Sequence, residues 1–344
     1  MSRVPVAILG ATGMVGQRLV ERLVDHPLFA LAAVAASDRS AGRPYGAATT
    51  WRLPGEVPAA AADLQVLAAT PEALPAGVRV VLSALDGAVA GPIERACIDA
   101  GLAVVTNASA LRMDPAVPLV IPEVNPHHLS LVDARPAGAG FAVANPNCCV
   151  IPLAMALAPL HARFGVEAVL TSTYQAVSGA GYPGESAWDM VGNVHPHTGN
   201  EEEKIAEETP RILGTAAAPA DFPVSARAVR VPTADGHMLA VHVRLRGQPP
   251  LDAVHEALAT WPGHHPPLPS CARPPLTLTA RRDRPAPRFD ADHRGGMGVT
   301  LGRLEPCPVL GVKFFVLAHN TIRGAAGAAL ANAELLAVTG RLGG

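Results

Sequence analysis

Short apolar segments alternate with helix-patterned segments through the first 150 residues of the chain. Apolar residues at three- and four-residue spacing predict helices from Met14 to about Val24 and over residues 89–100. Alternation of this kind is typical of a parallel, doubly wound α/β sheet of the Rossmann type. Apolar, β-branched runs predict strands over residues 4–10, 31–37, 64–69, 78–84, 103–107 and 140–144, with a proline-bounded strand over 118–126.

The pattern changes in the second half of the chain, where strands predominate. Beyond a helix over 151–164, we predict a helix that Asn200 caps, another over 251–261, and an alanine-rich helix over 324–338 that packs back onto the first domain. Strands with few helices between them form antiparallel sheets, so we expect an α+β domain with a mostly antiparallel sheet. These strands cover residues 167–177, 226–231, 237–245, 277–280, 297–304 and 312–318.

Composition excludes several classes of function. A net charge of −2 provides no basic surface for nucleic acid or for a membrane, and no apolar run is long enough to span a bilayer. The chain enters a strand directly, without a signal peptide. Five cysteines without a Cys-x-x-Cys pair do not form a disulfide framework. We therefore expect a cytoplasmic protein that acts on a small molecule, and 344 residues suit two domains.

A glycine-rich turn follows the first predicted strand and opens a helix. Gly10, Gly13 and Gly16 are spaced G-x-x-G-x-x-G, a variant of the dinucleotide-binding fingerprint. Glycines allow the backbone to approach a pyrophosphate, and the helix N-terminus stabilises its charge. The turn therefore predicts a site for a nicotinamide dinucleotide.

The end of the second predicted strand bears on which dinucleotide binds. Asp38 is the kind of residue that binds the ribose hydroxyls of NAD, whereas Arg39, with Ser37 and Ser40, suits the 2′-phosphate of NADP. One arginine and two hydroxyls outweigh one carboxylate. We therefore predict NADP(H) as the cofactor, with Asp38 facing solvent.

Cys148 lies where the segment 140–144 passes through a proline-fixed turn into the helix over 151–164. Unpaired N–H groups and the positive end of the helix dipole favour a thiolate over a thiol there. Pro152 fits the first helical turn, where its missing N–H costs no hydrogen bond. A lone cysteine is more often a small buried apolar residue. The dinucleotide site before it favours a nucleophile instead.

A covalent step at Cys148 needs a general acid and base, and His237 is the candidate. A protonated imidazole beside the thiol would lower the thiol pKa and shuttle a proton. The chain contains 13 histidines, most of which are expected to be structural. The pairs at 127–128, 195 and 197, and 264–265 lie in predicted loops, and we predict no metal site among them.

Nine segments, taken in order, resemble aspartate-β-semialdehyde dehydrogenases of the archaeal and fungal type over nearly the whole chain. They are GATGMVGQ, SDRSAGRPY, VPLVIPEVNPHHL, NPNCCV, YQAVSGAGYPG, GNEEEKIAEET, RVPTADGH, DRPAPRFD and HNTIRGAAG. The resemblance implies an NADP-binding domain of residues 1–147 with 322–344. It also implies a catalytic and dimerisation domain of residues 148–321, and a homodimer or homotetramer.

The resemblance implies roles for the matching positions. Cys148 matches the nucleophile that forms a thioacyl enzyme, His237 the acid and base, and Gln175 the glutamine that orients the reacting group. Arg230 matches the arginine that binds the substrate α-carboxylate, a task that suits a planar guanidinium. The other substrate positions are Arg112 and Lys204 for the phosphate, Glu201 for the amine, and Asn147. The cofactor positions are Gly10, Thr12, Gly13, Met14, Val15, Ser37, Arg39, Ser40, Ser83, Ser178, Gly179 and Asn320.

The implied reaction is the NADPH-dependent reductive dephosphorylation of L-aspartyl-4-phosphate to L-aspartate 4-semialdehyde, in amino-acid biosynthesis. The backbone N–H of Cys149 is a candidate oxyanion donor. Cys149 stands where relatives carry Ser or Thr, and residues 192–197 are more polar than in relatives. Two alternatives remain open: a reductase of another acyl phosphate or acyl-CoA, such as malonyl-CoA, and a non-catalytic NADPH-binding regulatory protein.

Overall fold

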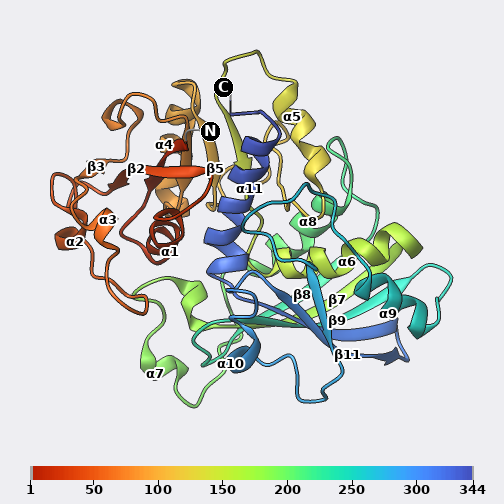
Figure 1. Ribbon diagram of the computed structural model, residues 1–344. Helices are drawn as coiled ribbons and strands as arrows, with labels where there is room; N and C mark the ends of the chain where they lie inside the picture. Colours follow the sequence, from red (N-terminus) through yellow and green to blue (C-terminus); the bar gives the residue numbers. More distant parts are fainter. Residues whose placement is uncertain (1–2, 343–344) are drawn as a thin grey trace.

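The computed structural model describes residues 3–342, which form two six-stranded sheets (Figure 1). The first sheet has the strand order β3-β2-β1-β4-β5-β6, and all its pairs are parallel. This is the order of doubly wound dinucleotide-binding folds, in which ligands lie at the carboxyl ends of the strands. Its strands are β1 (Val4–Leu9), β2 (Phe29–Ala36), β3 (Val66–Ala68), β4 (Val80–Ser83), β5 (Ala103–Thr106) and β6 (Phe141–Ala144).

The second sheet is mixed, in the order β10-β11-β12-β9-β7-β8. Its three central pairs are antiparallel, as predicted, and the outer pairs β10–β11 and β7–β8 are parallel. Its strands are β7 (Val166–Gln175), β8 (Val224–Arg230), β9 (His237–Leu245), β10 (Leu276–Thr279), β11 (Val299–Cys307) and β12 (Gly311–Ala318).

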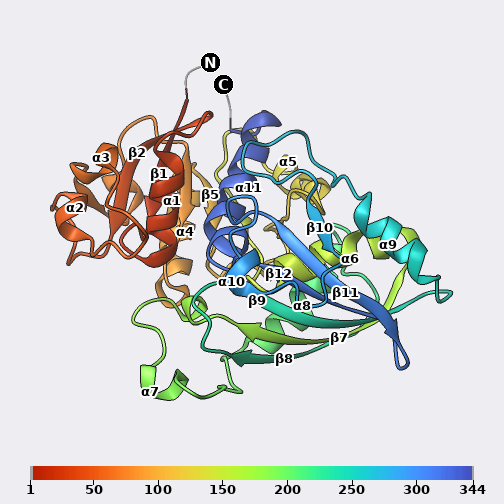
Figure 2. The ribbon, with the colours of Figure 1, turned by 60° about the horizontal axis from the view of Figure 1, so that its bottom comes forward.

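Helices cover both sheets (Figure 2). Helix α11 (Gly327–Val338) packs against β4, β5 and α1 (Met14–Leu23), as predicted for the C-terminal helix. Helix α7 (Ala187–Met190) instead projects from the body of the molecule (Figures 1 and 2). The other helices are α2 (Tyr45–Ala48), α3 (Ala59–Ala62), η1 (Pro71–Ala73), α4 (Gly87–Asp99), η2 (Pro126–Leu129), α5 (Ser130–Asp133), α6 (Val150–Phe164), η3 (Val177–Ala180), α8 (Glu201–Leu213), α9 (Leu251–Ala259), α10 (Pro287–Asp290) and the π-helical turn η4 (Ile322–Ala326).

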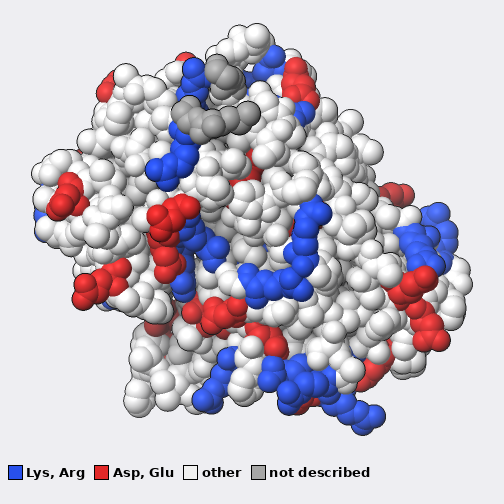
Figure 3. All heavy atoms as spheres, in the orientation of Figure 1, with Lys and Arg blue, Asp and Glu red and all other residues white. Residues whose placement is uncertain are grey.

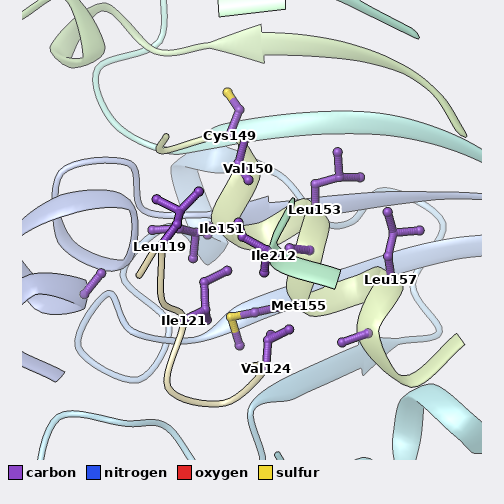
Figure 4. Close-up of a cluster of buried hydrophobic side chains, with 14 of the residues drawn as sticks. Leu119, Ile121, Val124, Cys149, Val150, Ile151, Leu153, Met155, Leu157 and Ile212 are labelled. Atoms are coloured by element: carbon purple, nitrogen blue, oxygen red, sulfur yellow. The ribbon is translucent and has the colours of Figure 1, made fainter. Parts of the chain in front are cut away.

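Helix α6 is the apolar centre of the larger core. Every residue from Val150 to Leu160 is buried, because the helix is apolar on all sides and neighbouring elements surround it. Leu119, Ile121 and Ile212 pack around its first turns (Figure 4). Truncating a fully buried leucine of such a helix costs about 2–5 kcal/mol. The core therefore holds the N-terminus of α6, and with it the cysteine turn, in one position.

The strand predicted over residues 118–126 is wrong. Only Leu119 forms a bridge, to Ala144, and the following residues turn away. The Asn125 side chain accepts the N–H of Ile121 at 2.8 Å and donates to the carbonyl of Leu119 at 2.8 Å, so it takes the groups that a strand partner would use. Three prolines in the segment also lack the N–H that a ladder needs.

Three helix starts differ from the predictions. Asn200 stands at the N-cap position of α8, but its side chain makes no capping hydrogen bond. The helix predicted over 324–338 begins with the π-helical turn η4 before α11. Helix α6 begins at Val150, with Cys149 at its N-cap, so Cys148 precedes the first helical residue.

The surface carries no field of a single sign on the face that Figure 3 shows. Acidic and basic side chains lie interspersed there, in keeping with the net charge of −2. Among residues 3–342, no helix is both long and apolar enough to cross a membrane.

Candidate active site

The turn between β6 and α6 is held by side-chain hydrogen bonds. The Asn147 side-chain oxygen accepts the N–H of Cys149 at 2.9 Å, and the Asn147 N–H donates to Glu208 at 2.6 Å. Because the Cys149 N–H already has an acceptor, the prediction that it is a free oxyanion donor is wrong for this arrangement. These two bonds instead fix the backbone that presents Cys148.

Gly324 allows η4 to approach the cysteine closely. A Cβ atom at Gly324 would lie 2.7 Å from the Cys148 Cβ, a distance that no side chain tolerates without a backbone shift. Glycine is the residue that permits such an approach. The segment after β12 thus packs directly against Cys148, although Gly324 lies 176 residues later in the chain.

The Cys148 thiol has a pKa well below its ordinary value. The main cause is a hydrogen bond from the Cys149 thiol to the thiolate, and His237 acts in the same direction, against burial and the charge of Glu201. Burial and the adjacent thiolate raise the pKa of Cys149 well above its ordinary value. The two shifts have opposite directions, so Cys148 is the more acidic of the two thiols.

His237 is fully buried at the start of β9, and its ring lies within 4.8 Å of both sulfurs. Its Nδ1 accepts the backbone N–H of Ala176 at 3.0 Å. An Nδ1 that accepts a hydrogen bond carries no hydrogen, so in the neutral ring the proton is on Nε2. No hydrogen bond engages Nε2 among the described residues. The ring is thus oriented as a proton donor.

Arg230 closes one side of the site from the end of β8. Its Nη1 donates to the side-chain oxygen of Gln175 at 3.0 Å and to the carbonyl of Ala176 at 3.1 Å. Its Nε donates to Glu185 at 3.1 Å. A guanidinium has five N–H groups, so the two hydrogens of Nη2 remain without a partner among the described residues.

Helix α8 supplies further charged groups to the site. Lys204 pairs with Glu201 at 2.9 Å, and the second oxygen of Glu201 accepts from the Asn147 side chain at 2.7 Å. Burial raises the pKa of Glu201, but these two partners outweigh it and leave the pKa below its ordinary value. Arg112 pairs with buried Glu208 at 3.0 Å and donates to the carbonyl of Asn107 at 2.7 Å.

These groups line one cavity of about 390 Å³ between the two sheets. Most of the residues predicted for the site share it: Met14, Val15, Arg112, Asn147, Cys148, Gln175, Ser178, Gly179, Glu201, Lys204, Arg230 and Asn320. His237 lies behind the cavity wall, next to the cysteines. Ser37, Asp38 and Arg39 are exposed at the end of β2, and Ser40 is half-buried.

The glycine turn has the close packing expected of a dinucleotide site. Gly10 has a φ of +75°, and a Cβ on Gly16 would lie 2.2 Å from the Gly10 carbonyl oxygen. Gly13 is the N-cap of α1, and its carbonyl accepts the N–H of Gln17. The turn therefore presents backbone N–H groups at a helix N-terminus, an arrangement that binds phosphate.

Comparison with known proteins decides the family. The model of the semialdehyde dehydrogenase NAD-binding domain matches residues 5–132, and that of the semialdehyde dehydrogenase dimerisation domain matches residues 157–323. The aspartate-semialdehyde dehydrogenase of Methanothermobacter thermautotrophicus is 43% identical, over 97% of this chain and 99% of the relative. The chain belongs to the aspartate-semialdehyde dehydrogenase family.

Other members extend the similarity. The enzyme of Archaeoglobus fulgidus is 42% identical over 97% of this chain and 98% of its own. The crystal structure of the Candida albicans aspartate-semialdehyde dehydrogenase with NADP has a TM-score of 0.89 and 36% identity, covering 98% of this chain and 99% of that one. The Vibrio cholerae aspartate semialdehyde dehydrogenase II, complexed with ASA, has a TM-score of 0.79 and 27% identity over 98% and 99% of the two chains.

Two groups of potential metal ligands lie among the described residues of this family member. The first group consists of Cys148, Cys149 and His237. Nδ1 of His237 accepts the N–H of Ala176, so the ring hydrogen is on Nε2, the nitrogen that would have to bind the metal. In the second, both oxygens of Glu123 already bind Arg323, at 2.9 and 2.8 Å. Neither donor set is arranged for a metal.

Sequence reasoning missed three contributors to the site. Glu208 joins Arg112 to the backbone of Asn147, Glu185 binds Arg230, and the N–H of Ala176 sets the tautomer of His237. Each acts through a partner far away in the sequence. A buried glutamate on the apolar face of α8 was the one available signal, since burial of Glu208 predicts a charged partner.

Proposed function

We propose that the protein reduces L-aspartyl-4-phosphate to L-aspartate 4-semialdehyde with NADPH, reversibly, through a thioacyl intermediate on Cys148. The observation that carries this proposal is the position of Cys148, which lines a cavity together with the cationic side chains of Arg230 and Lys204, suited to an acidic substrate. Family membership supports the substrate, because curated relatives at 37–43% identity bear the name aspartate-semialdehyde dehydrogenase.

NADP(H) fits the residues at the first sheet. The turn at Gly10, Thr12 and Gly13 would hold the pyrophosphate, because added Cβ atoms at Gly10 and Gly16 would collide with neighbouring backbone. Arg39, with Ser37 and Ser40, would hold the 2′-phosphate at the end of β2. Met14, Val15, Ser178, Gly179 and Asn320, which line the cavity, would hold the remainder of the cofactor. Ser83, predicted to bind it as well, is fully buried at the end of β4 and does not line this cavity. When bound, NADPH supplies the hydride.

Substrate binding falls to charged groups around the cavity. Arg230 would bind the α-carboxylate and Glu201 the amine, each by charge-assisted hydrogen bonds. Arg112 and Lys204 would hold the phosphate. The ion pair with Glu208 positions the guanidinium of Arg112, and the ion pair with Glu201 positions the ammonium of Lys204. Asn147 and Gln175 would orient the acyl group, since both side chains reach Glu201.

The covalent step begins at Cys148. Its thiolate attacks the acyl carbon, the bond from that carbon to the phosphate oxygen breaks, and phosphate leaves. The Cys149 thiol is placed to stabilise the Cys148 thiolate before the acyl group is attached and again after the aldehyde has left. In the reverse direction phosphate, rather than water, takes the acyl group from the sulfur.

His237 would act as a hydrogen-bond donor. Its Nε2–H can stabilise the oxyanion that forms when hydride adds to the thioester carbon, and this oxyanion becomes the aldehyde carbonyl as the Cys148 thiolate leaves. The N–H of Ala176 holds the ring in this tautomer.

We extend the proposal to the assembly and its setting. The matched dimerisation domain supports a homodimer or homotetramer. The first sheet with α11 supports a cofactor domain of residues 1–147 with 322–344, and the second sheet a catalytic domain of residues 148–321. Absence of a disulfide framework among five cysteines supports the cytoplasm.

A paired assay tests the function. We expect phosphate-dependent reduction of NADP⁺ with L-aspartate 4-semialdehyde, and no comparable oxidation of NADPH with malonyl-CoA. Activity confined to malonyl-CoA would refute the substrate while leaving the thioacyl chemistry in place. Absence of both activities, together with retained NADPH binding, would favour a regulatory protein.

A further inference from the structure

The donors of Arg230 are almost fully engaged within the protein. Gln175 and Ala176 take the two hydrogens of Nη1, and Glu185 takes the hydrogen of Nε. The Arg230 side chain is only 7% exposed. A carboxylate that enters the cavity therefore meets a guanidinium with one free nitrogen, Nη2, rather than with the two free nitrogens that bidentate binding needs.

A carboxylate binds arginine in parallel pairs of N–H···O bonds, along the Nη1–Nη2 edge or along the Nε–Nη2 edge. The first edge is held by the buried side chain of Gln175 and by the backbone of Ala176. The second edge is held only by Glu185, whose side chain is 25% exposed. Bidentate binding therefore requires the Nε–Nη2 edge, and Glu185 must leave it.

The chain on either side of Glu185 is anchored by contacts that do not involve its carboxylate. On one side, the guanidinium carbon of Arg52 lies 3.2 Å from the centre of the Tyr182 ring. On the other, the backbone of His195 exchanges two hydrogen bonds with Arg230, at 3.0 and 2.8 Å. The second oxygen of Glu185 has no hydrogen-bond partner among the described residues, so release breaks one ion pair. Helix α7, which begins two residues further along the chain, projects from the body of the molecule (Figure 2).

We propose that Glu185 is an internal carboxylate that competes with the substrate carboxylate for Arg230 and thereby weakens substrate binding. This inference rests on the proposed role of Arg230. It makes Glu185 a determinant of affinity rather than of chemistry, since it contacts neither Cys148 nor His237. Ion pairs at partly exposed sites have modest strength, so its removal should change affinity by about three- to tenfold.

Kinetics of Glu185→Gln test the proposal against a matched control. The control is Glu202→Gln, which removes the same charge from a 3.1 Å ion pair with Arg227 on the same strand as Arg230. We expect Glu185→Gln to lower the KM for L-aspartate 4-semialdehyde about three- to tenfold with little change in kcat. An unchanged or raised KM would overturn the proposal, and a raised KM would show that Glu185 positions Arg230.

A second readout needs no turnover. Alkylation of Cys148 by iodoacetate, which bears a carboxylate, is compared with alkylation by neutral iodoacetamide. Glu185→Gln should raise the iodoacetate-to-iodoacetamide rate ratio at Cys148, and Glu202→Gln should leave it at the wild-type value. An unchanged ratio in Glu185→Gln would overturn the proposal. If the wild-type protein does not use the semialdehyde at all, the proposed function fails and the ratio alone decides the role of Glu185.

Discussion

Two thiols of this protein have a pKa below the ordinary value, and only one of them lies in a reaction site. Burial raises the pKa of Cys307, but hydrogen bonds from His242, at 3.4 Å, and from the backbone of the β11–β12 hairpin bring it down to about 7. Cys148 has its own histidine and a second thiol as donor. Both regions thus stabilise a thiolate by the same physical means.

The difference lies in what surrounds each sulfur. Cys148 lines a cavity with Arg230, Lys204 and the glycine turn, whereas Cys307 ends a strand and closes a hairpin. A lowered pKa makes a cysteine nucleophilic, but catalysis also requires a bound and oriented substrate. Thiol acidity by itself therefore does not identify the nucleophile.

The largest expected effect separates the two cysteines directly. Cys148→Ala should lower kcat by at least about 10⁴-fold, because the covalent route is lost, while NADPH binding measured by fluorescence stays intact. The matched variant Cys307→Ala should retain turnover within about twofold, since surface and hairpin changes away from the site are usually small. Turnover that survives in Cys148→Ala would refute the thioacyl intermediate.

The two histidines provide the next comparison. His237→Asn should lower kcat by about 10²–10³-fold, the range for loss of a hydrogen-bond donor to an oxyanion. His242→Asn, which removes the donor to Cys307, should leave kcat unchanged. Steady-state kinetics at saturating substrate check both variants. Equal losses in the two would mean that the buried ring of His237 supports the fold rather than the chemistry.

Two arginines on β8 test the substrate side of the comparison. Arg230→Lys should raise the KM for L-aspartate 4-semialdehyde by at least about tenfold, because an ammonium cannot make two parallel hydrogen bonds to a carboxylate. Arg227→Lys is the control, because the Arg227 side chain is 81% exposed and forms a surface ion pair with Glu202. A KM in Arg230→Lys that matches the control would remove Arg230 from the substrate site.

The smallest expected effect concerns pH. A pKa below the ordinary value keeps a thiol ionised as the pH falls, so alkylation of Cys148 by iodoacetamide should persist well below pH 8, where an ordinary thiol slows about tenfold per pH unit. Alkylation of Cys307 should fall below a pH of about 7. Peptide mapping by mass spectrometry distinguishes the two sites.

Cys149→Ala sharpens that result. Loss of the donor thiol should move the half-maximal pH of Cys148 alkylation upward by about one pH unit, because one pH unit corresponds to about 1.4 kcal/mol, the strength of a good hydrogen bond to a charged group. The profile of Cys307 should not move. An unshifted Cys148 profile would assign the acidity to His237 and the helix N-terminus instead.

Local patterns in the sequence were sufficient for most of the fold. All twelve strands of the two sheets fall within or next to apolar runs that periodicity picks out, because burial on a pleated sheet depends on neighbouring residues in the chain. The error at residues 118–126 arose because the Asn125 side chain competes for backbone groups, and periodicity does not report on such bonds. The π-helical turn at Ile322–Ala326 also lies outside what periodicity describes.

By itself, the sequence determined the chemistry: a glycine turn for a dinucleotide, a cysteine before an apolar helix, and a histidine and arginine in one short segment. Only the tertiary structure decided which groups are free to use that chemistry. In the folded protein, the Asn147 side chain accepts the N–H of Cys149, and Nδ1 of His237 accepts the N–H of Ala176. Glu185 accepts a hydrogen bond from Arg230. The last two of these contacts join positions 45 or more residues apart, and their formation depends on how two sheets pack rather than on local pattern.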